Sequence, residues 1–334
     1  MSDFNDSPDC TPPPRSELEW AWDFLQTLRG EISRVLIGQR AVVDQVLIAL
    51  SAAGHVLIEG APGLGKTLLA RALAACVNAR FARIQFTADL MPSDVTGHAL
   101  YNLREERFEI RQGPVFCNFL LADEINRAPA KTQAALLEVM QEGQVTIEGQ
   151  SFPLPPPFMT LATQNPIEHE GTYPLPEAQL DRFLLKIQMD YPSIEEETAL
   201  LRAVTGGRVG DRLDVSPVRA VADPAGVVHL QRLTARLRLD DTVLDYGVRL
   251  VAATRKTPGF AIGAGPRGGI ALIRAARAQA LLSGRDFVTP DDVKSIALPA
   301  LRHRLTLAAE YEMEGARVDE VLDDVLRRVA APRV

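Results

Sequence analysis

The chain has 334 residues, 46% of them hydrophobic and 24% charged, proportions typical of a folded globular protein rather than of a disordered chain. The formal net charge of −7 disfavours a surface for nucleic acid or anionic membrane. No apolar run approaches the roughly 18 residues that a membrane span needs, and the N-terminus lacks the features of a secretory signal. The three cysteines are scattered, so we expect no disulfide framework or zinc site and a cytoplasmic location.

The predicted elements follow a tail rich in Pro, Ser and Asp over residues 1–16. Apolar residues at helical spacing predict a helix over 17–36 and a second one that ends near residue 53. Strand patterns then alternate with helical patterns, the strands at 55–59, 82–86, 115–124, 158–165 and 183–189, the helices at 67–77 and 135–142. This alternation predicts an α/β domain built on a five-stranded parallel sheet that helices cover on both faces.

A second, smaller domain is predicted after the last strand. A Gly- and Val-rich segment over 206–227 is expected to be a linker. Over 228–334 helical periodicity predominates, and proline marks two helix starts, at Gly265-Pro266 and Thr289-Pro290. The sequence therefore predicts a core over 17–205 followed by an all-helical domain.

A glycine-rich turn joins the first strand of the core to the helix after it. Its residues, 60–67, are Gly-Ala-Pro-Gly-Leu-Gly-Lys-Thr and fit the pattern G-x-x-x-x-G-K-[ST]. The glycines allow backbone N–H groups to face phosphate oxygens, Lys66 supplies a cation for the β- and γ-phosphates, and the Thr67 hydroxyl can ligate Mg²⁺. The next helix directs its N-terminus at the same anion. The motif therefore favours a nucleotide triphosphate site over a glycine-rich turn without ligand.

Acidic and amide side chains end two later strands. Asp123 and Glu124 follow an apolar strand, where Asp123 would hold Mg²⁺ through water and Glu124 would orient and deprotonate the attacking water. Taken alone, the two acids could instead cap a helix. Asn165 ends the next strand and could contact the γ-phosphate or position the water, although Asn165-Pro166 alone would indicate a turn. The phosphate loop upstream favours the catalytic interpretation.

Two arginines are candidates for stabilising charge in a transition state. Arg182 lies in a Leu-Asp-Arg-Phe segment just before the last strand, and Arg267 follows the helix start at Gly265-Pro266. An arginine finger can raise a rate by several powers of ten. Since 31 residues of the chain are arginine, either one without further context could be an ordinary surface residue.

Together these motifs form a recognisable combination. The chain resembles the MoxR family of AAA+ ATPases, in the helix-2-insert clade, most densely over 113–146 and 157–184. The resemblance implies an αβα P-loop core with a helical lid, assembled in a ring, usually a hexamer, that binds ATP between subunits. It also implies that residues near 98–113 form the insertion. Their alternating pattern suits a projecting β-hairpin, a candidate element for contacting substrate.

The resemblance assigns roles to the later motifs. It implies that Asn165 is sensor 1, that Arg182 is the arginine finger acting on the neighbouring subunit's ATP, and that Arg267 is sensor 2. One departure from the family pattern is Gly265, where serine is usual before Pro-Arg. Glycine is a poorer helix N-cap than serine, so Arg267 is expected to keep its place with slightly less rigidity.

The resemblance also defines the nucleotide site. Lys66 and Glu124 are expected to take part in catalysis with the three residues above, and Thr67 and Asp123 to hold Mg²⁺. The residues expected to bind ATP are Ile37, Gly38, Gly60, Ala61, Pro62, Gly63, Leu64, Gly65, Lys66, Thr67, Leu68 and Asp123. Of these, Ile37 and Gly38 would lie against the adenine base.

The predicted function is Mg²⁺-dependent ATP hydrolysis that drives chaperone-like remodelling or maturation of a client protein or complex. MoxR-like proteins often act with a partner that carries a von Willebrand factor A domain, which we expect on another polypeptide. One alternative is the ATPase subunit of a metal chelatase, although the long chelatase insertions are not evident. Another is an ATP-dependent assembly switch with little turnover. A nucleic-acid motor fits poorly with the negative charge. His303, in Leu-Arg-His-Arg-Leu, is expected on a helix surface.

Overall fold

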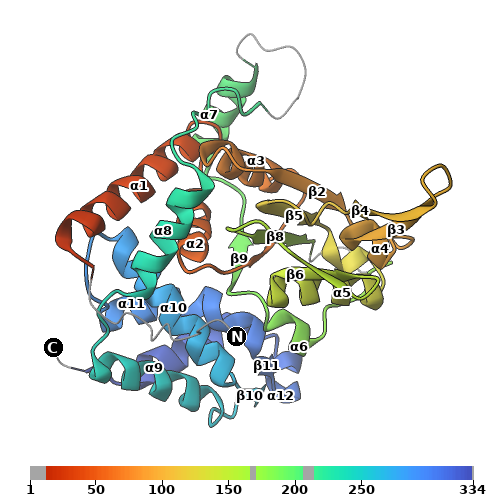
Figure 1. The fold of residues 1–334 in the computed structure, drawn as a ribbon. Coiled ribbons are helices and arrows are strands. Elements are labelled where there is room, and N and C mark those ends of the chain that lie inside the picture. The colour runs from red at the N-terminus through yellow and green to blue at the C-terminus, as the bar shows by residue number, and fades with distance from the viewer. Residues whose placement is uncertain (1–12, 166–170, 206–213, 333–334) are drawn as a thin grey trace, which may run out of the picture.

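The computed structural model describes residues 13–165, 171–205 and 214–332, which form a core and a lid (Figure 1). The elements up to the last strand of the sheet are α1 (Arg15–Ser33), α2 (Arg40–Ser51), β1 (Val56–Gly60), α3 (Lys66–Cys76), β2 (Phe81–Gln85), α4 (Pro92–Thr96), β3 (Gly97–Asn102), β4 (Arg107–Gln112), β5 (Phe119–Asp123), η1 (Ile125–Arg127), α5 (Ala130–Glu142), β6 (Gln144–Ile147), β7 (Gln150–Pro153), β8 (Met159–Gln164), α6 (Glu177–Leu180) and β9 (Leu185–Met189). The later elements are α7 (Ile194–Thr205), α8 (Pro224–Ala235), α9 (Asp241–Thr254), β10 (Phe260–Ile262), α10 (Pro266–Leu282), α11 (Pro290–Leu301), η2 (Arg302–Arg304), β11 (Thr306–Leu307), α12 (Ala309–Met313) and α13 (Val318–Arg328). Within these described ranges, no helix combines the length and the apolar character needed to cross a membrane.

Five strands form one parallel sheet in the order β2-β5-β8-β1-β9. Val56, at the start of β1, pairs with Leu161 of β8 on one side and with Leu185 of β9 on the other. Each of the five segments predicted as strands overlaps one of these five. The α/β class and the five-stranded parallel sheet are therefore confirmed.

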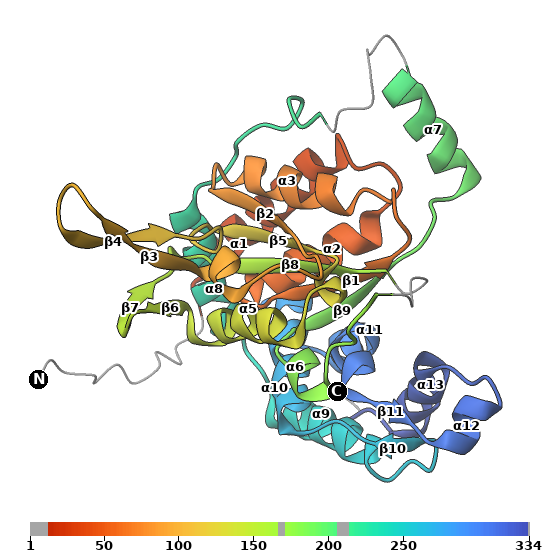
Figure 2. The same cartoon turned by 90° about the vertical axis from the view of Figure 1, so that its right-hand side faces the viewer.

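Helices cover both faces of the sheet (Figure 2). Successive residues of a strand point to opposite sides. Val56 and Ile58 of β1 accordingly pack in a core with α1, α2 and α3, whereas Leu57 packs in a second core with α5. All three side chains are fully buried. Burial on both faces explains why the strand segments are nearly continuous apolar runs.

The second domain is helical, with one addition. α10 begins at Pro266 and α11 at Pro290, the two starts predicted from the sequence. Phe260–Ile262, before α10, and Thr306–Leu307, after α11, pair as two short antiparallel strands. The expectation of an all-helical domain is wrong in this respect. The turn η2 separates α11 from β11, whose pairing with β10 satisfies backbone polar groups of both strands.

The segment expected as a linker is partly helical. Its residues 206–213 lie outside the described residues, as do residues 1–12 of the expected tail. α8 begins inside the remainder, at Pro224, where the Asp223 carboxylate accepts a hydrogen bond of 2.7 Å from the Gly226 N–H as an N-cap. Farther along α8, the Gln231 amide donates to the Leu50 carbonyl of α2 at 2.9 Å. This helix therefore packs on the core, and the limits of the two domains stay predictions.

Two β-hairpins leave the core. β3 and β4 pair antiparallel from Gly97 with Gln112, which confirms the hairpin expected over 98–113. The exposed rings of Tyr101 and Phe108 meet edge to face across it, with centroids 5.2 Å apart. The hairpin β6–β7 was not predicted. Its turn at Glu148-Gly149, where both residues have positive φ, follows alternating apolar residues and is the signal that could have found it.

Candidate active site

The phosphate loop lies where β1 meets α3. Gly63 and Gly65 have φ values of 84° and 95°, a left-handed conformation that favours glycine. Gly60 must lack a side chain for a different reason, because a Cβ there would lie 2.4 Å from the Met189 carbonyl oxygen of β9. Lys66 opens α3, and its Nζ donates to the Gly60 carbonyl at 2.7 Å. The strand–loop–helix arrangement that phosphate binding requires is therefore present.

The two acids at the end of β5 share one neighbour. The Asp123 carboxylate accepts a hydrogen bond of 2.6 Å from the Thr163 hydroxyl, whose oxygen accepts one of 2.9 Å from the Glu124 N–H. Thr163 lies on β8 and is almost fully buried. Glu124 itself has a φ of 56°, an uncommon conformation for a residue other than glycine and one that recurs at functional sites. One hydroxyl thus fixes the side chain of one acid and the backbone of the other.

Three further side chains hold the same acids. Arg83 Nη2 lies 2.7 Å from Asp123 Oδ2. The Gln85 amide donates to Glu124 Oε2 at 2.8 Å, and Arg127 Nε lies 3.0 Å from that oxygen. These contacts fix the positions of both carboxylates. Sequence reasoning missed all three. Arg83 and Gln85 come from β2, which only its pairing with β5 brings to this site. Arg127 lies three residues after Glu124, and this short spacing is the signal that could have found it.

These groups gather at one edge of the sheet because the strands are parallel. Gly60 and Asp123 end β1 and β5, and β8 runs between those two strands. Gly60 lies two positions farther along the strands than Asp123, so spacings of about 4.8 Å per strand and about 3.3 Å per residue put the two residues about 12 Å apart. Asn165 follows β8, between them, and is buried. The structure therefore brings together the phosphate loop, both acids and Asn165, as the sequence predicts.

The segment expected on the adenine side lies beside the phosphate loop. Leu36 packs on the loop, since a Cβ at Gly65 would lie only 2.8 Å from Leu36 Cδ1. The Gln39 amide donates to the carbonyl of Asp190, just after β9, at 2.9 Å. Ile37 and Gly38 lie between these two contacts and are partly exposed. Their position suits a base bound next to the loop, and their contact with adenine stays a prediction.

The residues at this edge suit a magnesium nucleotide. Mg²⁺ takes oxygen ligands and is usually held by one or two protein groups together with water and substrate phosphates. The Asp123 carboxylate and the Thr67 hydroxyl are oxygens of this kind. Gly63 leaves open space at the loop, with nothing within 4 Å of the position of a Cβ. In the part of the chain that the structure describes, no group of three His, Cys, Asp or Glu residues could hold a metal by itself. The donor set fits Mg²⁺ bound jointly with a nucleotide.

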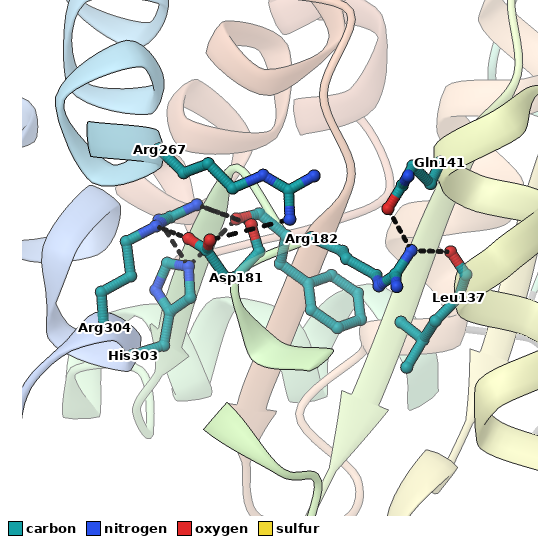
Figure 3. Close-up of polar contacts among 8 residues, drawn as sticks. Leu137, Gln141, Asp181, Arg182, Arg267, His303 and Arg304 are labelled. Carbon is teal, nitrogen blue, oxygen red and sulfur yellow. Dashed lines mark hydrogen bonds and ion pairs between the residues drawn. The ribbon is translucent and has the colours of Figure 1, made fainter. Parts of the chain in front are cut away.

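Arg182 and Arg267 line one pocket, in which Figure 3 shows their polar contacts. Arg182 precedes β9, beside the start of β1, and a five-residue strand rises about 16 Å from there to the phosphate loop. Arg267 Nη1, from the lid, lies 3.8 Å from Asp181 Oδ2. Arg182 Nη1 donates to the Leu137 carbonyl at 3.2 Å and to the Gln141 side chain of α5. Neither arginine therefore shares an edge with the phosphate loop of its own chain.

A basic pocket surrounds these two arginines. The described charged residues that line it are one aspartate and four arginines, namely Asp181, Arg182, Arg267, Arg274 and Arg304. His55 lines it too, and burial lowers the pKa of this histidine to about 4, so its ring is neutral at pH 7. The surplus of positive charge suits an anionic ligand.

His303 departs from the sequence prediction. It does not lie on a helix surface but is 6% exposed, and its Nε2 lies 3.0 Å from the Phe183 carbonyl oxygen. The cause is η2, a tight turn that follows the end of α11 and directs the ring inward. Burial, aided by neighbouring Arg304, holds the pKa of His303 well below its usual value. The ring is therefore neutral at pH 7, and its Nε2 also lies 2.6 Å from Arg304 Nη1.

Comparison with known proteins places the chain in a family. A model of the "ATPase family associated with various cellular activities (AAA)" matches residues 55–185, and an "AAA lid domain" model matches 252–325. Chaperone MoxR1 of Mycobacterium tuberculosis is 46% identical over 91% of this chain and 81% of its own length. Protein YeaC of Bacillus subtilis, described as uncharacterized, is 48% identical over 90% of this chain and 92% of its own.

A solved structure supports the same placement. A crystal structure from Cytophaga hutchinsonii, assigned there as an ATPase, superposes with a TM-score of 0.87 at 39% identity and covers 95% of this chain and 98% of that one. A magnesium-chelatase 38 kDa subunit of Acidiphilium rubrum is only 28% identical over 64% of the chain, so this similarity does not favour the chelatase alternative. The two family models and the identity of 46% to Chaperone MoxR1 over 91% of this chain show that the chain belongs to the MoxR family of AAA+ ATPases.

Proposed function

We propose that this protein hydrolyses ATP with Mg²⁺, in active sites that two copies of the chain share. The observation that carries this proposal is the position of Arg182 and Arg267 at the edge opposite the phosphate loop. They are remote from the nucleotide of their own chain, whereas a second copy docked edge to edge would place its ATP against them. Repetition of such a head-to-tail contact gives a ring when the rotation closes. A hexamer is the ring size that we propose.

One copy would bind the nucleotide and activate water. The backbone N–H groups of the loop and the Lys66 ammonium would hold the phosphates. Asp123 and Thr67 would hold Mg²⁺, which when bound neutralises charge on the phosphates. Glu124 would orient the attacking water and accept its proton at Oε2, the oxygen that Gln85 and Arg127 now contact. Asn165 would position this water or the γ-phosphate.

The next copy would complete the site. Guanidinium groups present several donors in a fixed plane and remain charged at any working pH. Arg182 and Arg267 would direct them at the γ-phosphate and stabilise the negative charge that spreads over its oxygens as the bond breaks.

ATP turnover would serve chaperone-like remodelling of a client protein. "Chaperone" is the name that MoxR1 bears. The hairpin β3–β4 exposes 83% of Leu103 and 72% of Phe108, an apolar surface on a projecting element that a client chain could contact. A von Willebrand factor A partner remains part of the proposal. So does the cytoplasm, since the buried Cys76 and Cys117 thiols are unpaired.

The first test is the ATPase rate per subunit across a series of protein concentrations, with Mg²⁺. A shared site predicts a rate per subunit that rises with concentration as rings assemble. The control is Glu124→Gln, which should bind ATP yet turn over far more slowly. A mutant that hydrolyses ATP at the normal rate would remove Glu124 as the base.

Mixed rings test whether the site is shared. Arg182→Ala should abolish turnover while leaving its own phosphate loop intact, and Lys66→Ala should weaken ATP binding while leaving Arg182 intact. Combined, the two inactive variants should form some complete sites and regain activity. No recovery at ratios that form mixed rings would contradict an arginine acting between subunits.

A further inference from the structure

We propose that Asp181 and Arg304 form a joint through which the lid positions Arg182 of the same chain, and so the arginine offered to the neighbouring subunit's ATP. This inference rests on the shared active site proposed above. Neither residue would touch the nucleotide, so both are positioning residues. Through this joint, the position of the lid in one subunit would change the rate of ATP hydrolysis in the next.

Arg304 is a lid residue whose side chain is bound mainly to the core (Figure 3). The side chain is 5% exposed, and its Nε lies 2.6 Å from Asp181 Oδ1. Nη2 donates to the carbonyls of Asp181 and Phe183, at 3.1 and 2.7 Å, and Nη1 contacts the Leu184 carbonyl at 3.4 Å. These carbonyls lie on both sides of Arg182 in the chain. A displacement of Arg304 must therefore carry the backbone of Arg182 with it or break a charge-assisted network.

Asp181 is a core residue whose carboxylate contacts two separate parts of the lid. Its Oδ1 accepts from Arg304, which follows α11, and its Oδ2 lies 3.8 Å from Arg267 at the start of α10. His303 adds a contact to the same segment through the Phe183 carbonyl. A buried guanidinium that loses its carboxylate is strongly disfavoured, so the pair resists separation when the lid moves.

The same segment is anchored to the core on its other side. The Leu184 N–H donates to the His55 carbonyl at 2.8 Å, at the start of β1. Arg182 itself reaches α5 through Nη1, yet its Nε is buried and has no hydrogen-bond partner among the described residues. The guanidinium thus uses only part of its donor set in this position. Less interaction opposes its release toward a phosphate than would oppose a fully bonded arginine.

The decisive variant is Asp181→Asn in the full-length chain. Asparagine keeps the shape of the side chain but removes the charge that binds Arg304 and Arg267. A misplacement of about 1 Å at a positioning group can cost about 100-fold in rate, and we expect a loss of this order in ATP turnover. Binding of a fluorescent ATP analogue and the mass of the ring should match the wild type. Added Lys66→Ala subunits, which carry an intact joint, should restore part of the turnover.

Thr306→Val is the matched control. The Thr306 hydroxyl also joins the lid to the core, through the Glu177 carboxylate, without contacting residues 181–184. Its loss should leave turnover within about twofold of the wild type, as for an ordinary exposed substitution. If Asp181→Asn does not fold, Arg304→Lys keeps the positive charge but lacks the planar fork, and the same loss and the same rescue are expected of it.

Several outcomes would overturn the joint. Wild-type turnover in Asp181→Asn would show that the lid contact does not position Arg182. Slow turnover with weakened ATP binding, or without rescue by Lys66→Ala, would show a general structural defect instead. Arg182→Ala, mixed with Lys66→Ala in parallel, separates the two proposals. If Arg182→Ala is not rescued, the shared site itself fails; if it is rescued while Asp181→Asn behaves as wild type, only the joint fails.

Discussion

Thr163→Val should damage both the stability and the activity of the protein. The Thr163 hydroxyl donates to the Asp123 carboxylate and accepts from the Glu124 N–H, at 2.6 and 2.9 Å. Valine has the same shape but neither polar function. The change therefore tests whether one buried hydroxyl holds the two acids in place.

The magnitude follows from the two contacts. A hydrogen bond to an ionised group contributes about 1.5–3 kcal/mol, and a buried N–H left without a partner costs about 1–3 kcal/mol. Glu124 is partly exposed, so water can satisfy some of the loss, and we expect a decrease of about 3 kcal/mol in the free energy of unfolding. Residues that orient a metal ligand typically contribute 10- to 100-fold in activity, and turnover should fall by about that factor.

Thr160→Val is the control that isolates the hydroxyl. Thr160 lies three residues earlier on β8 and is also fully buried, but its hydroxyl has no hydrogen-bond partner in the described structure. Removal of an unsatisfied polar group should be neutral or stabilise the fold by up to about 1 kcal/mol. Urea unfolding and steady-state ATP turnover would be measured on both variants. Equal stabilities, or normal turnover in Thr163→Val, would refute the role of this hydroxyl.

Three further predictions concern the loop, the lid and a buried histidine. Gly60→Ala should lower the unfolding free energy by more than about 2 kcal/mol and weaken ATP binding, because its Cβ would meet the Met189 carbonyl at 2.4 Å; unchanged binding in a fluorescence titration would contradict this. Gly265→Ser should raise the unfolding free energy by about 0.5–1 kcal/mol, since the N-cap site is open and extended, and a lower melting temperature would count against it. Burial lowers the pKa of His55 from 6.5 to about 4. Below pH 6.5 the unfolded chain therefore binds a proton at His55 that the folded chain does not, and the free energy of unfolding falls by up to about 3 kcal/mol as the pH falls toward 4. The stabilities of the wild type and His55→Gln, measured in urea, should accordingly converge between pH 7 and pH 4.5, and parallel curves would exclude His55 as the cause.

The features predicted correctly are those whose cause lies within a few neighbouring residues. The phosphate loop needs glycines at left-handed positions followed by a helix start, and residues 60–67 contain all of that information. The starts of α10 and α11 need only a proline after a capping residue. Buried parallel strands need apolar runs of strand length. Each of these patterns can be read from neighbouring residues without knowing the fold.

Most of the site contacts that were missed depend on residues that are distant in the sequence. Thr163 and Arg83 reach Asp123 from 40 positions away on either side, and only the register of three strands brings them together. Arg304 reaches Asp181 across 123 positions. The prediction that His303 lies on a helix surface failed for the same reason, because the group that it contacts is a carbonyl 120 residues earlier in the chain. Periodicity within a segment contains no information on such pairings.

The sheet explains how one chain can serve two active sites at once. Its parallel strands gather the phosphate loop, both acids and Asn165 at their carboxyl ends, while the turns at their amino ends bear Asp181 and Arg182. The lid arginines Arg267 and Arg304 join this second edge and not the first. Under the proposal above, a movement of the lid would reach the arginine edge of its own subunit first. If that edge faces the ATP of a neighbour, the state of one subunit sets the rate in the next without any contact between the two phosphate loops.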